Sequence, residues 1–319
     1  MANLAIDEPI LLTGTSHVGL ARDIAKILKL ELFEPISIFS DGEIRVRVAP
    51  NMRRRHVFII QPTAPKVNDS IMEVLFMIDA AKRASAAEIS VIIPYFSYSR
   101  QDRKEMPRVP ISSSVVAQMI ENTGASRIVT VDIHSEQQQG FVQIPWDNLY
   151  GSYALLPFIK SKNLDGMVVA SPDKGGLLRA TSYAKMLEAS AVALVYKQRD
   201  VTLNNQSRAL AMIGDVKDKH VILVDDMLDT GGTIVHAADF LKKKGAKSIR
   251  VAVTHGLFSG DAIDNISKSA IDEVIITDTI ALRPDVSKNP KVKVATVAPL
   301  VAEAIKRIRT GESISNLIF

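Results

Sequence analysis

The feature that most constrains the fold is a regular alternation of short Val- and Ile-rich runs with segments of helical periodicity along the whole chain. The runs are almost continuously apolar, which is typical of strands that are covered on both faces. Strands that alternate with helices predict a parallel sheet and an α/β fold. The expected strands are residues 10–12, 57–61, 89–93, 128–133, 167–170, 191–195, 221–224, 249–253 and 273–277.

Three segments between and after these strands have clear helical patterns. Residues 69–83 carry apolar side chains almost all round, so this helix is expected to be deeply buried or to lie in an interface, with Asn68 or Asp69 capping its start. Residues 234–244 end in three lysines before a glycine, which is typical of a helix C-terminus and needs no binding role. Residues 299–309 are expected to be helical and to pack on either half of the chain.

Length and composition narrow the class of protein. The 319 residues, 47% of them hydrophobic, suffice for two ordinary domains, and turn residues near 145–155 favour a division into 1–148 and 149–319. No cysteine is present, which excludes disulfides, thiolate metal ligands and a cysteine nucleophile. The start of the sequence does not look like a signal peptide and no apolar run is long enough to span a membrane, so a cytoplasmic protein is expected. A net charge of +4 suits phosphate ligands but does not indicate nucleic acid.

The strongest motif covers residues 221–233, where a buried strand is followed by three acids and by a Thr-Gly-Gly-Thr turn that opens the next helix. Glycines let backbone N–H groups approach a phosphate, and the helix N-terminus adds a positive dipole. The carboxylates suit two sugar hydroxyls or a Mg²⁺ shell. A plain solvated corner is the alternative, but three acids within five residues make it the poorer explanation. The residues are Asp225, Asp226, Asp229, Thr230, Gly231, Gly232 and Thr233.

A nucleotide would have to bind without a Walker-type loop. Residues 14–19 have the glycine spacing but lack the phosphate-binding lysine, and no GxGxxG opens a helix. A basic cluster at residues 100–104 follows the strand 89–93, at the sheet edge where α/β proteins bind ligands. Arginine forks suit polyphosphate, although a solvated loop would have the same composition.

Two strand ends carry single residues that could bind a metal. His134 follows the strand 128–133, and taken alone such a histidine is more often structural. Asp173 follows the strand 167–170 in a Ser-Pro-Asp sequence, where an aspartate is often only a turn residue.

A basic pair, Lys197 and Arg199, follows the strand 191–195 and precedes a polar stretch at 200–208. The stretch is expected to be a mobile loop or lid. Without further information, an exposed basic pair beside a loop is the simpler interpretation.

Taken in order, these segments resemble the ribose-phosphate pyrophosphokinase family from end to end, and residues 221–233 resemble the phosphoribosyl pyrophosphate-binding loop of the phosphoribosyltransferase-type fold. The matching stretches are residues 39–43, 98–102, 131–134, 140–141, 169–173, 175–176, 197–199, 214–216, 221–233 and 255–260. The resemblance implies two tandem phosphoribosyltransferase-like domains, each a mainly parallel sheet flanked by helices, with the active site between them.

The resemblance also implies an activity in nucleotide biosynthesis. The β,γ-pyrophosphate of Mg-ATP would move to the C1 hydroxyl of ribose 5-phosphate, giving phosphoribosyl pyrophosphate and AMP, with Mg²⁺ as cofactor. It implies a homo-oligomer, a hexamer built from dimers, with inorganic phosphate and ADP as effectors. A non-catalytic regulatory subunit and a phosphoribosyltransferase that consumes phosphoribosyl pyrophosphate are the alternatives.

Residue roles follow from the resemblance position by position. The ATP-binding residues would be Phe39, Asp41, Gly42, Glu43, Arg100, Gln101, Asp102 and His134. Ribose 5-phosphate would be bound by Arg199, Asp225, Asp226, Asp229, Thr230, Gly231, Gly232 and Thr233. Lys197 and Arg199 would be catalytic, His134 and Asp173 would bind metal, and Arg53, Ser313 and Ser315 would belong to a regulatory site.

Three positions depart from the family pattern. Gln138 stands where family members usually have an apolar residue, and Val142 stands where they have a second phenylalanine. Residues 53–55 are three arginines in place of a milder turn. These departures concern local packing and effector response more than catalysis.

Overall fold

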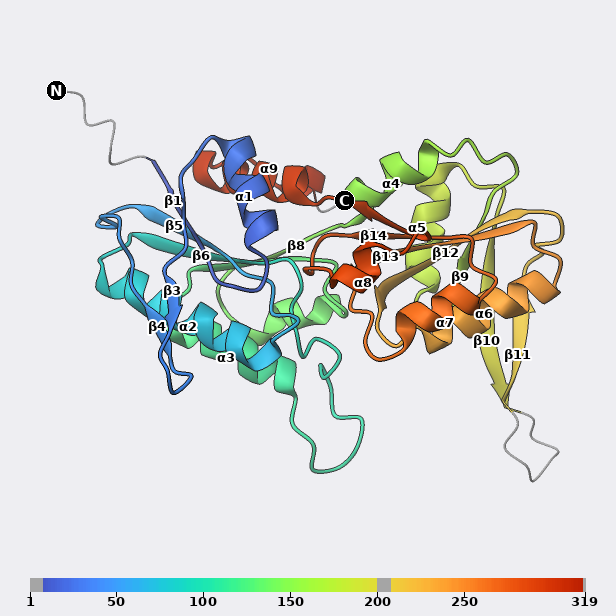
Figure 1. The fold of residues 1–319 in the computed structure, drawn as a ribbon, viewed down its shortest axis with the longest axis horizontal. Helices are drawn as coiled ribbons and strands as arrows, with labels where there is room; N and C mark the ends of the chain where they lie inside the picture. The colour runs from blue at the N-terminus through green and yellow to red at the C-terminus, as the bar shows by residue number, and fades with distance from the viewer. Residues whose placement is uncertain (1–7, 200–207, 318–319) are drawn as a thin grey trace. The chain divides into compact units, whose positions relative to one another are not determined.

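The structure is a computed structural model that describes residues 8–199 and 208–317. Its residues form two compact units (Figure 1). The first contains residues up to 151 together with 279–281 and the segment from 297 on, and the second contains 152–278 and 282–296. The domain limits expected from the sequence, 1–148 and 149–319, stay a prediction about folding units.

The first unit is built on a six-stranded parallel sheet with the order β2-β1-β5-β6-β7-β8. The strands are β1 (Ile10–Thr13), β2 (Leu32–Phe33), β5 (His56–Ile60), β6 (Glu88–Ile93), β7 (Arg127–Val131) and β8 (Trp146–Leu149). A separate antiparallel hairpin consists of β3 (Ile36–Ile38) and β4 (Ile44–Val46).

Helices cover both faces of this sheet (Figure 1). On one face, α2 (Val67–Arg83) packs against α3 (Ser112–Thr123), and their apolar side chains join those of the strands in one buried core. On the other face, α1 (Val18–Leu28) packs against α9 (Ala298–Thr310), the helix expected at 299–309. Two short 3₁₀ helices, η1 (Glu136–Phe141) and η2 (Ser315–Leu317), complete the unit.

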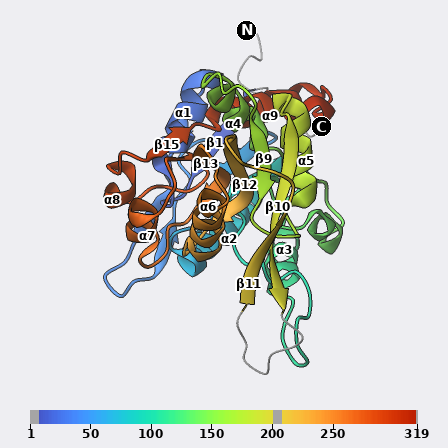
Figure 2. The ribbon, with the colours of Figure 1, turned by 90° about the vertical axis from the view of Figure 1, so that its right-hand side faces the viewer.

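The second unit is built on a seven-stranded sheet with the order β11-β10-β9-β12-β13-β14-β15, in which only the β10–β11 pair is antiparallel (Figure 2). The strands are β9 (Val168–Ser171), β10 (Ala191–Arg199), β11 (Arg208–Ile213), β12 (His220–Leu228), β13 (Ser248–Gly256), β14 (Glu273–Thr277) and β15 (Val292–Ala295). The helices are α4 (Ser152–Lys160), α5 (Leu177–Leu187), α6 (Gly232–Lys243), α7 (Ala262–Lys268) and α8 (Pro284–Ser287).

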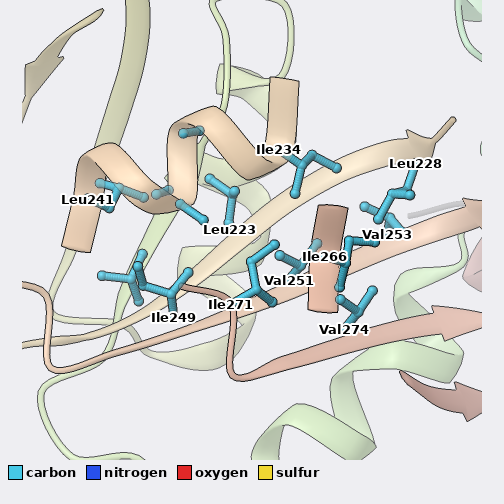
Figure 3. Close-up of a cluster of buried hydrophobic side chains, with 14 of the residues drawn as sticks. Leu223, Leu228, Ile234, Leu241, Ile249, Val251, Val253, Ile266, Ile271 and Val274 are labelled. Carbon is cyan, nitrogen blue, oxygen red and sulfur yellow. The ribbon is translucent and has the colours of Figure 1, made fainter. Parts of the chain in front are cut away.

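Two apolar layers hold this second sheet. Side chains of α6 and α7 pack on one face against β12, β13 and β14 (Figure 3). Side chains of α4 and α5 pack on the opposite face against β9 and β12. Both layers are closed, which explains why the strands read as continuous apolar runs in the sequence.

The two units share one topology. In chain order, the six parallel strands of the first unit follow the spatial order 2-1-3-4-5-6, and strands β9, β10 and β12–β15 of the second follow the same order. In this correspondence β1 matches β9, β5 matches β12, α1 matches α5 and α2 matches α6. The α/β fold with two mainly parallel sheets flanked by helices is therefore confirmed.

Several element ends differ from the sequence-based expectation. Strand β7 ends at Val131 rather than at 133, because Asp132 adopts a left-handed backbone with φ +43°. Strands β10 and β12 extend beyond their apolar runs, because each pairs with a long neighbour. Helix α2 begins at Val67 with Lys66 at its N-cap, so the expected capping by Asn68 or Asp69 was wrong. Within the described residues, no helix is long and apolar enough to cross a membrane.

Candidate active site

The acidic corner of the second unit lies where β12 meets α6. Asp225 and Asp226 belong to the strand itself, and Asp226 is 7% exposed. Gly231 has a φ of +77°, a left-handed conformation that favours glycine and lets the chain turn into the helix. Helix α6 begins at Gly232, and its N-cap residue, Gly231, has no side chain that could cap the first turn. Its first N–H groups can therefore bind an anion.

The electrostatics of this corner are unfavourable in the free protein. Burial raises the pKa of the Asp225 carboxyl well above its ordinary value, and the negative charge of Asp226 raises it further. Asp173, in the loop between β9 and α5, also raises this pKa, while the positive charge of Arg179 on α5 lowers it. Two carboxylates on β12 and one in the β9–α5 loop thus place negative charge close together, and a ligand that carries hydroxyl groups or a cation would offset it.

Asp173 is exposed in the tight turn between β9 and α5. Its Oδ1 accepts a hydrogen bond from the Gly176 N–H at 3.0 Å, and its carbonyl oxygen accepts one from Ser171 Oγ at 2.7 Å. A Cβ at position 176 would lie 2.6 Å from Ser171 Oγ, so the turn requires glycine there. The carboxylate is therefore held in place at the carboxyl end of a strand.

The donor set of this corner fits Mg²⁺. Within the described residues, no three His, Asp or Glu side chains group as a ready-made metal cage. Mg²⁺ typically binds through one or two carboxylates together with substrate phosphates and water, so a preformed cage is not required. The oxygen donors Asp173, Asp225 and Asp226 have the chemistry that this ion prefers.

The predicted catalytic pair lies within a strand rather than after one. Lys197 pairs with Leu210, and Arg199 with Arg208, in the antiparallel ladder of β10 and β11 (Figure 2). The polar run of this segment concealed its strand character, because the apolar pattern stops at residue 195. The side chains of the pair, and most of the expected lid at 200–208, lie outside the described residues.

In the first unit, the basic loop follows β6 as expected. Arg100 and Gln101 are exposed, and Asp102 is half-buried. The Gln101 N–H donates to the Tyr98 carbonyl at 2.8 Å, and Ser112 Oγ at the start of α3 donates to Gln101 Oε1 at 2.6 Å. The loop is thus tied to α3, with the arginine directed away from the core.

His134 lies three residues beyond the end of β7 and is exposed. The segment before it is anchored, because the Asp132 N–H donates to the Leu149 carbonyl at 2.8 Å and Asp132 Oδ2 accepts from the Gly151 N–H at 3.1 Å. Since β6 and β7 are parallel neighbours, the structure places the segments of Arg100 and His134 at the same edge of the sheet.

The expected adenine-binding residues lie at the tip of the β3–β4 hairpin, in a sheet of their own. Gly42 has a φ of +94°, and the Glu43 N–H donates to Asp41 Oδ1 at 3.0 Å, which closes the tip. Phe39 is 48% exposed, with the Arg45 guanidinium carbon 5.7 Å from its ring centroid. An aromatic ring presented in this way is suited to stacking on a base.

The proposed regulatory residues also lie in the first unit. Arg53 is exposed, and its N–H donates to Asn51 Oδ1 at 3.1 Å. Ser313 and Ser315 are exposed, with their hydroxyl oxygens 3.1 Å apart. Arg307 of α9 donates from Nη1 to the Ser313 carbonyl at 2.8 Å, which fixes that turn.

Sequence reasoning missed two buried polar residues of the first unit, Glu73 and Gln138, which are 2% and 0% exposed. Helical spacing puts Glu73 on the same face as Ser70 and Met77, and a charge on a buried face could have been noticed. Gln138 was noted only as a departure from the family pattern. Arg179 was also missed, because α5 carries no other sign of function.

The fold and the acidic corner define the class of protein first: a tandem α/β protein of the phosphoribosyltransferase type. Residues 9–124 match the family model described as the N-terminal domain of ribose phosphate pyrophosphokinase, and residues 195–319 match the phosphoribosyl synthetase-associated domain. The chain belongs to the ribose-phosphate pyrophosphokinase family, and it is an enzyme.

Individual relatives agree with this assignment. The ribose-phosphate pyrophosphokinase of Helicobacter hepaticus is 46% identical over 310 residues, covering 97% of this chain and 98% of the relative. That of Wolinella succinogenes is 47% identical over 308 residues, covering 96% and 98%. The crystal structure of phosphoribosylpyrophosphate synthetase from Mycobacterium smegmatis superposes with a TM-score of 0.89 at 37% identity, covering 95% of this chain and 99% of that chain.

Proposed function

We propose that this chain transfers the β,γ-pyrophosphate of Mg-ATP to the C1 hydroxyl of ribose 5-phosphate, giving phosphoribosyl pyrophosphate and AMP. The observation that carries the proposal is the corner between β12 and α6, where the carboxylates of Asp225 and Asp226 lie next to a glycine-led helix N-terminus. A sugar phosphate satisfies both halves of this corner at once, because it brings hydroxyl donors and a phosphate acceptor on one molecule.

In this proposal the 5-phosphate binds the first N–H groups of α6 and the hydroxyls of Thr230 and Thr233, both exposed. Asp225 and Asp226 accept hydrogen bonds from the ribose hydroxyls, with Asp229 and Arg199 beside them. The ribose hydroxyls can donate hydrogen bonds to these neighbouring carboxylates, which favours the occupied state.

ATP is proposed to bind in the first unit. Arg100 and Gln101 contact its phosphates, and His134 and Asp102 lie beside them. The Phe39 ring stacks on the adenine, while Asp41 and Glu43 read its edge. In the family this hairpin serves the site of a neighbouring subunit, so we propose that a homo-oligomer, a hexamer built from dimers, completes each site.

Mg²⁺ is the proposed cofactor, held by Asp173 and, through water, by His134. When bound, the ion would neutralise charge on the phosphates of the donor and acceptor. The chain's own contribution is positioning and charge stabilisation: Lys197 and Arg199 offset the charge that develops as the pyrophosphoryl group moves in line from AMP to the sugar. Inorganic phosphate and ADP are proposed effectors at Arg53, Ser313 and Ser315, in a cytoplasmic enzyme.

The decisive experiment incubates purified protein with ATP, ribose 5-phosphate, Mg²⁺ and inorganic phosphate and quantifies AMP and phosphoribosyl pyrophosphate. Lys197→Ala is run in parallel, with Lys243→Ala, at the exposed end of α6, as the matched control. We expect equimolar products from the wild type and the control, and a large loss in Lys197→Ala. Formation of ADP would contradict the reaction. Activity that requires a partner chain would indicate a regulatory subunit, and base-dependent release of pyrophosphate would indicate a phosphoribosyltransferase.

A further inference from the structure

Gln138 is a fully buried amide in η1, four residues beyond His134 in the sequence. A buried amide is costly unless both its ends find partners. Here both do: Nε2 donates to the Ser99 carbonyl at 2.9 Å, and Oε1 accepts a hydrogen bond from Ser113 Oγ. Ser99 is 3% exposed and Ser113 is 0% exposed, so water does not replace these bonds.

The partners of this amide hold the backbone on both sides of Arg100. Ser99 immediately precedes the arginine, and its carbonyl is the group that Gln138 binds. On the other side, the Ser113 N–H donates to the Gln101 carbonyl at 3.3 Å. The hydroxyl of the same serine donates to Gln138. Ser113 of α3 therefore connects the contact before Arg100, made by Gln138, to the contact after it, made by its own N–H.

The loop needs such anchors because its backbone is strained. Tyr98 has a φ of +61°, a left-handed conformation that costs a residue with a Cβ about 1 kcal/mol or more. Its hydroxyl donates to Asn68 Oδ1 at 2.6 Å, which ties the loop to α2 as well. A strained loop persists only when its surroundings determine it, and at functional sites this serves to preorganise side chains.

We propose that Gln138 is a positioning residue, which couples the Arg100 loop to the segment that carries His134 and so presets the arginine for the phosphates of ATP. The inference rests on the proposed function of this loop. It gives a role to a position where the family usually has an apolar residue, and it makes the geometry of the nucleotide site in this chain depend on a buried hydrogen-bond network.

The test replaces Gln138 by leucine, which has similar volume but no hydrogen-bonding groups. We expect the KM for ATP and the Kd for Mg-ATP, measured by calorimetry, to rise about 10-fold, since two buried partners lose their bonds. The KM for ribose 5-phosphate and kcat are expected to stay within about 2-fold, because the loop does not serve them. Gln139→Leu is the matched control, since its Nε2 donates to the Glu136 carbonyl within the same 3₁₀ helix and not to the Arg100 loop.

A second variant separates positioning from core stability. Adding Ser113→Ala to Gln138→Leu removes the hydroxyl that was left without its acceptor, so the melting temperature is expected to recover in part. The KM for ATP is expected to stay raised, because the Ser99 carbonyl still lacks its anchor. If Gln138→Leu fails to fold, Ser113→Ala alone, which removes one bond, is expected to raise the KM for ATP about 3-fold.

The outcomes distinguish this inference from the reaction itself. A lower melting temperature with unchanged KM and Kd for ATP would overturn the positioning role while leaving the reaction intact. Recovery of ATP binding in the double variant would do the same. If the wild type binds Mg-ATP without making phosphoribosyl pyrophosphate, the proposed reaction fails, yet weaker Mg-ATP binding by Gln138→Leu would still support the positioning role.

Discussion

The two units share one topology but differ in chemistry at one corner. In the first unit this corner lies where β1 and β5 end, and in the second unit it lies where the matching strands β9 and β12 end. In the first unit, Glu73 on α2 accepts hydrogen bonds from the Thr15 N–H at 2.8 Å, from Thr15 Oγ1 at 2.6 Å and from Gln61 Nε2. The start of α1 is also closed, because His17 Nδ1 accepts from the Leu20 N–H at 3.2 Å. The chain's own side chains therefore occupy this corner.

In the second unit the acids of the matching corner lie on β12 rather than on the helix. Burial and the negative charge of Asp226 raise the pKa of Asp225 well above its ordinary value. The helix that matches α1 is α5, and its N-cap residue, Gly176, makes no side-chain hydrogen bond to the start of that helix. Departures from locally satisfied chemistry, such as a carboxyl with a strongly raised pKa, are expected at functional sites. We therefore interpret the first corner as structural and predict that the second corner binds ligand.

Replacing Asp225 by asparagine is expected to have the largest effect. The amide keeps the shape but loses one acceptor and the negative charge, so we expect activity to fall about 100-fold or more. Stability should change in the opposite direction, because a buried like-charge contact is removed. Assays of phosphoribosyl pyrophosphate formation and calorimetric melting would check both. A variant that loses activity and stability together would contradict the view that this corner is frustrated.

Removing the carboxylate of Glu73 is expected to destabilise the first unit. In Glu73→Ala the Thr15 N–H and the Gln61 amide lose a buried charged acceptor, at a cost of about 2 kcal/mol. Trp146 is the single tryptophan of the chain and lies buried in β8, so its fluorescence during urea unfolding reports on this unit alone. Asp79→Ala, at an exposed ion pair with Arg83 on the same helix, should leave the free energy of unfolding almost unchanged, because solvent screens the pair. Equal effects in both variants would show that the corner is not self-satisfied.

Replacing a glycine by alanine is expected to affect the stability of the two corners differently, because the space beside each glycine differs. In Gly14→Ala the new Cβ would lie within 2.6 Å of side-chain atoms of Glu73 and Gln61, two residues that are hydrogen-bonded to each other. We therefore expect the free energy of unfolding to fall by about 1 to 2 kcal/mol. In Gly232→Ala the Cβ meets nothing within 4 Å, and stability should change little or rise slightly because alanine favours helix. Urea unfolding of both variants measures the two changes in the free energy of unfolding. A Gly14→Ala variant as stable as the wild type would contradict the prediction.

The smallest expected effect is a pH dependence of the second unit. Because the folded pKa of Asp225 is raised, the folded protein binds this proton more tightly than the unfolded chain does. The stability that Asp225 contributes is therefore present at low pH and is lost as the pH rises through the raised pKa. The stability gained by Asp225→Asn should vanish near the ordinary aspartate pKa of about 4 and grow above it. Calorimetric melting of both proteins from pH 4 to 8 tests this, and a constant difference would speak against it.

The fold could be predicted because its strands are apolar runs, whose pattern depends only on local sequence. The positions of Asp225 and Lys197 within strands could not be predicted, because polar residues extend a strand only when a neighbouring strand pairs with them. The acids and glycines of the second corner were found because a motif places them within nine residues of one another in the sequence. Glu73 was missed because its partner Thr15 lies 58 positions away. A network of that kind exists only once the chain has folded.

The packing of α9 on α1 has a consequence for synthesis. The first unit is interrupted in sequence by the second, because residues 298–310 complete one face of a sheet whose strands end at residue 149. On the ribosome the chain emerges from its N-terminus, so the second unit is available in full before the first has its last helix. Until then the face of α1 that α9 covers is exposed, so the nascent chain is expected to be open to aggregation and to chaperone binding during this interval.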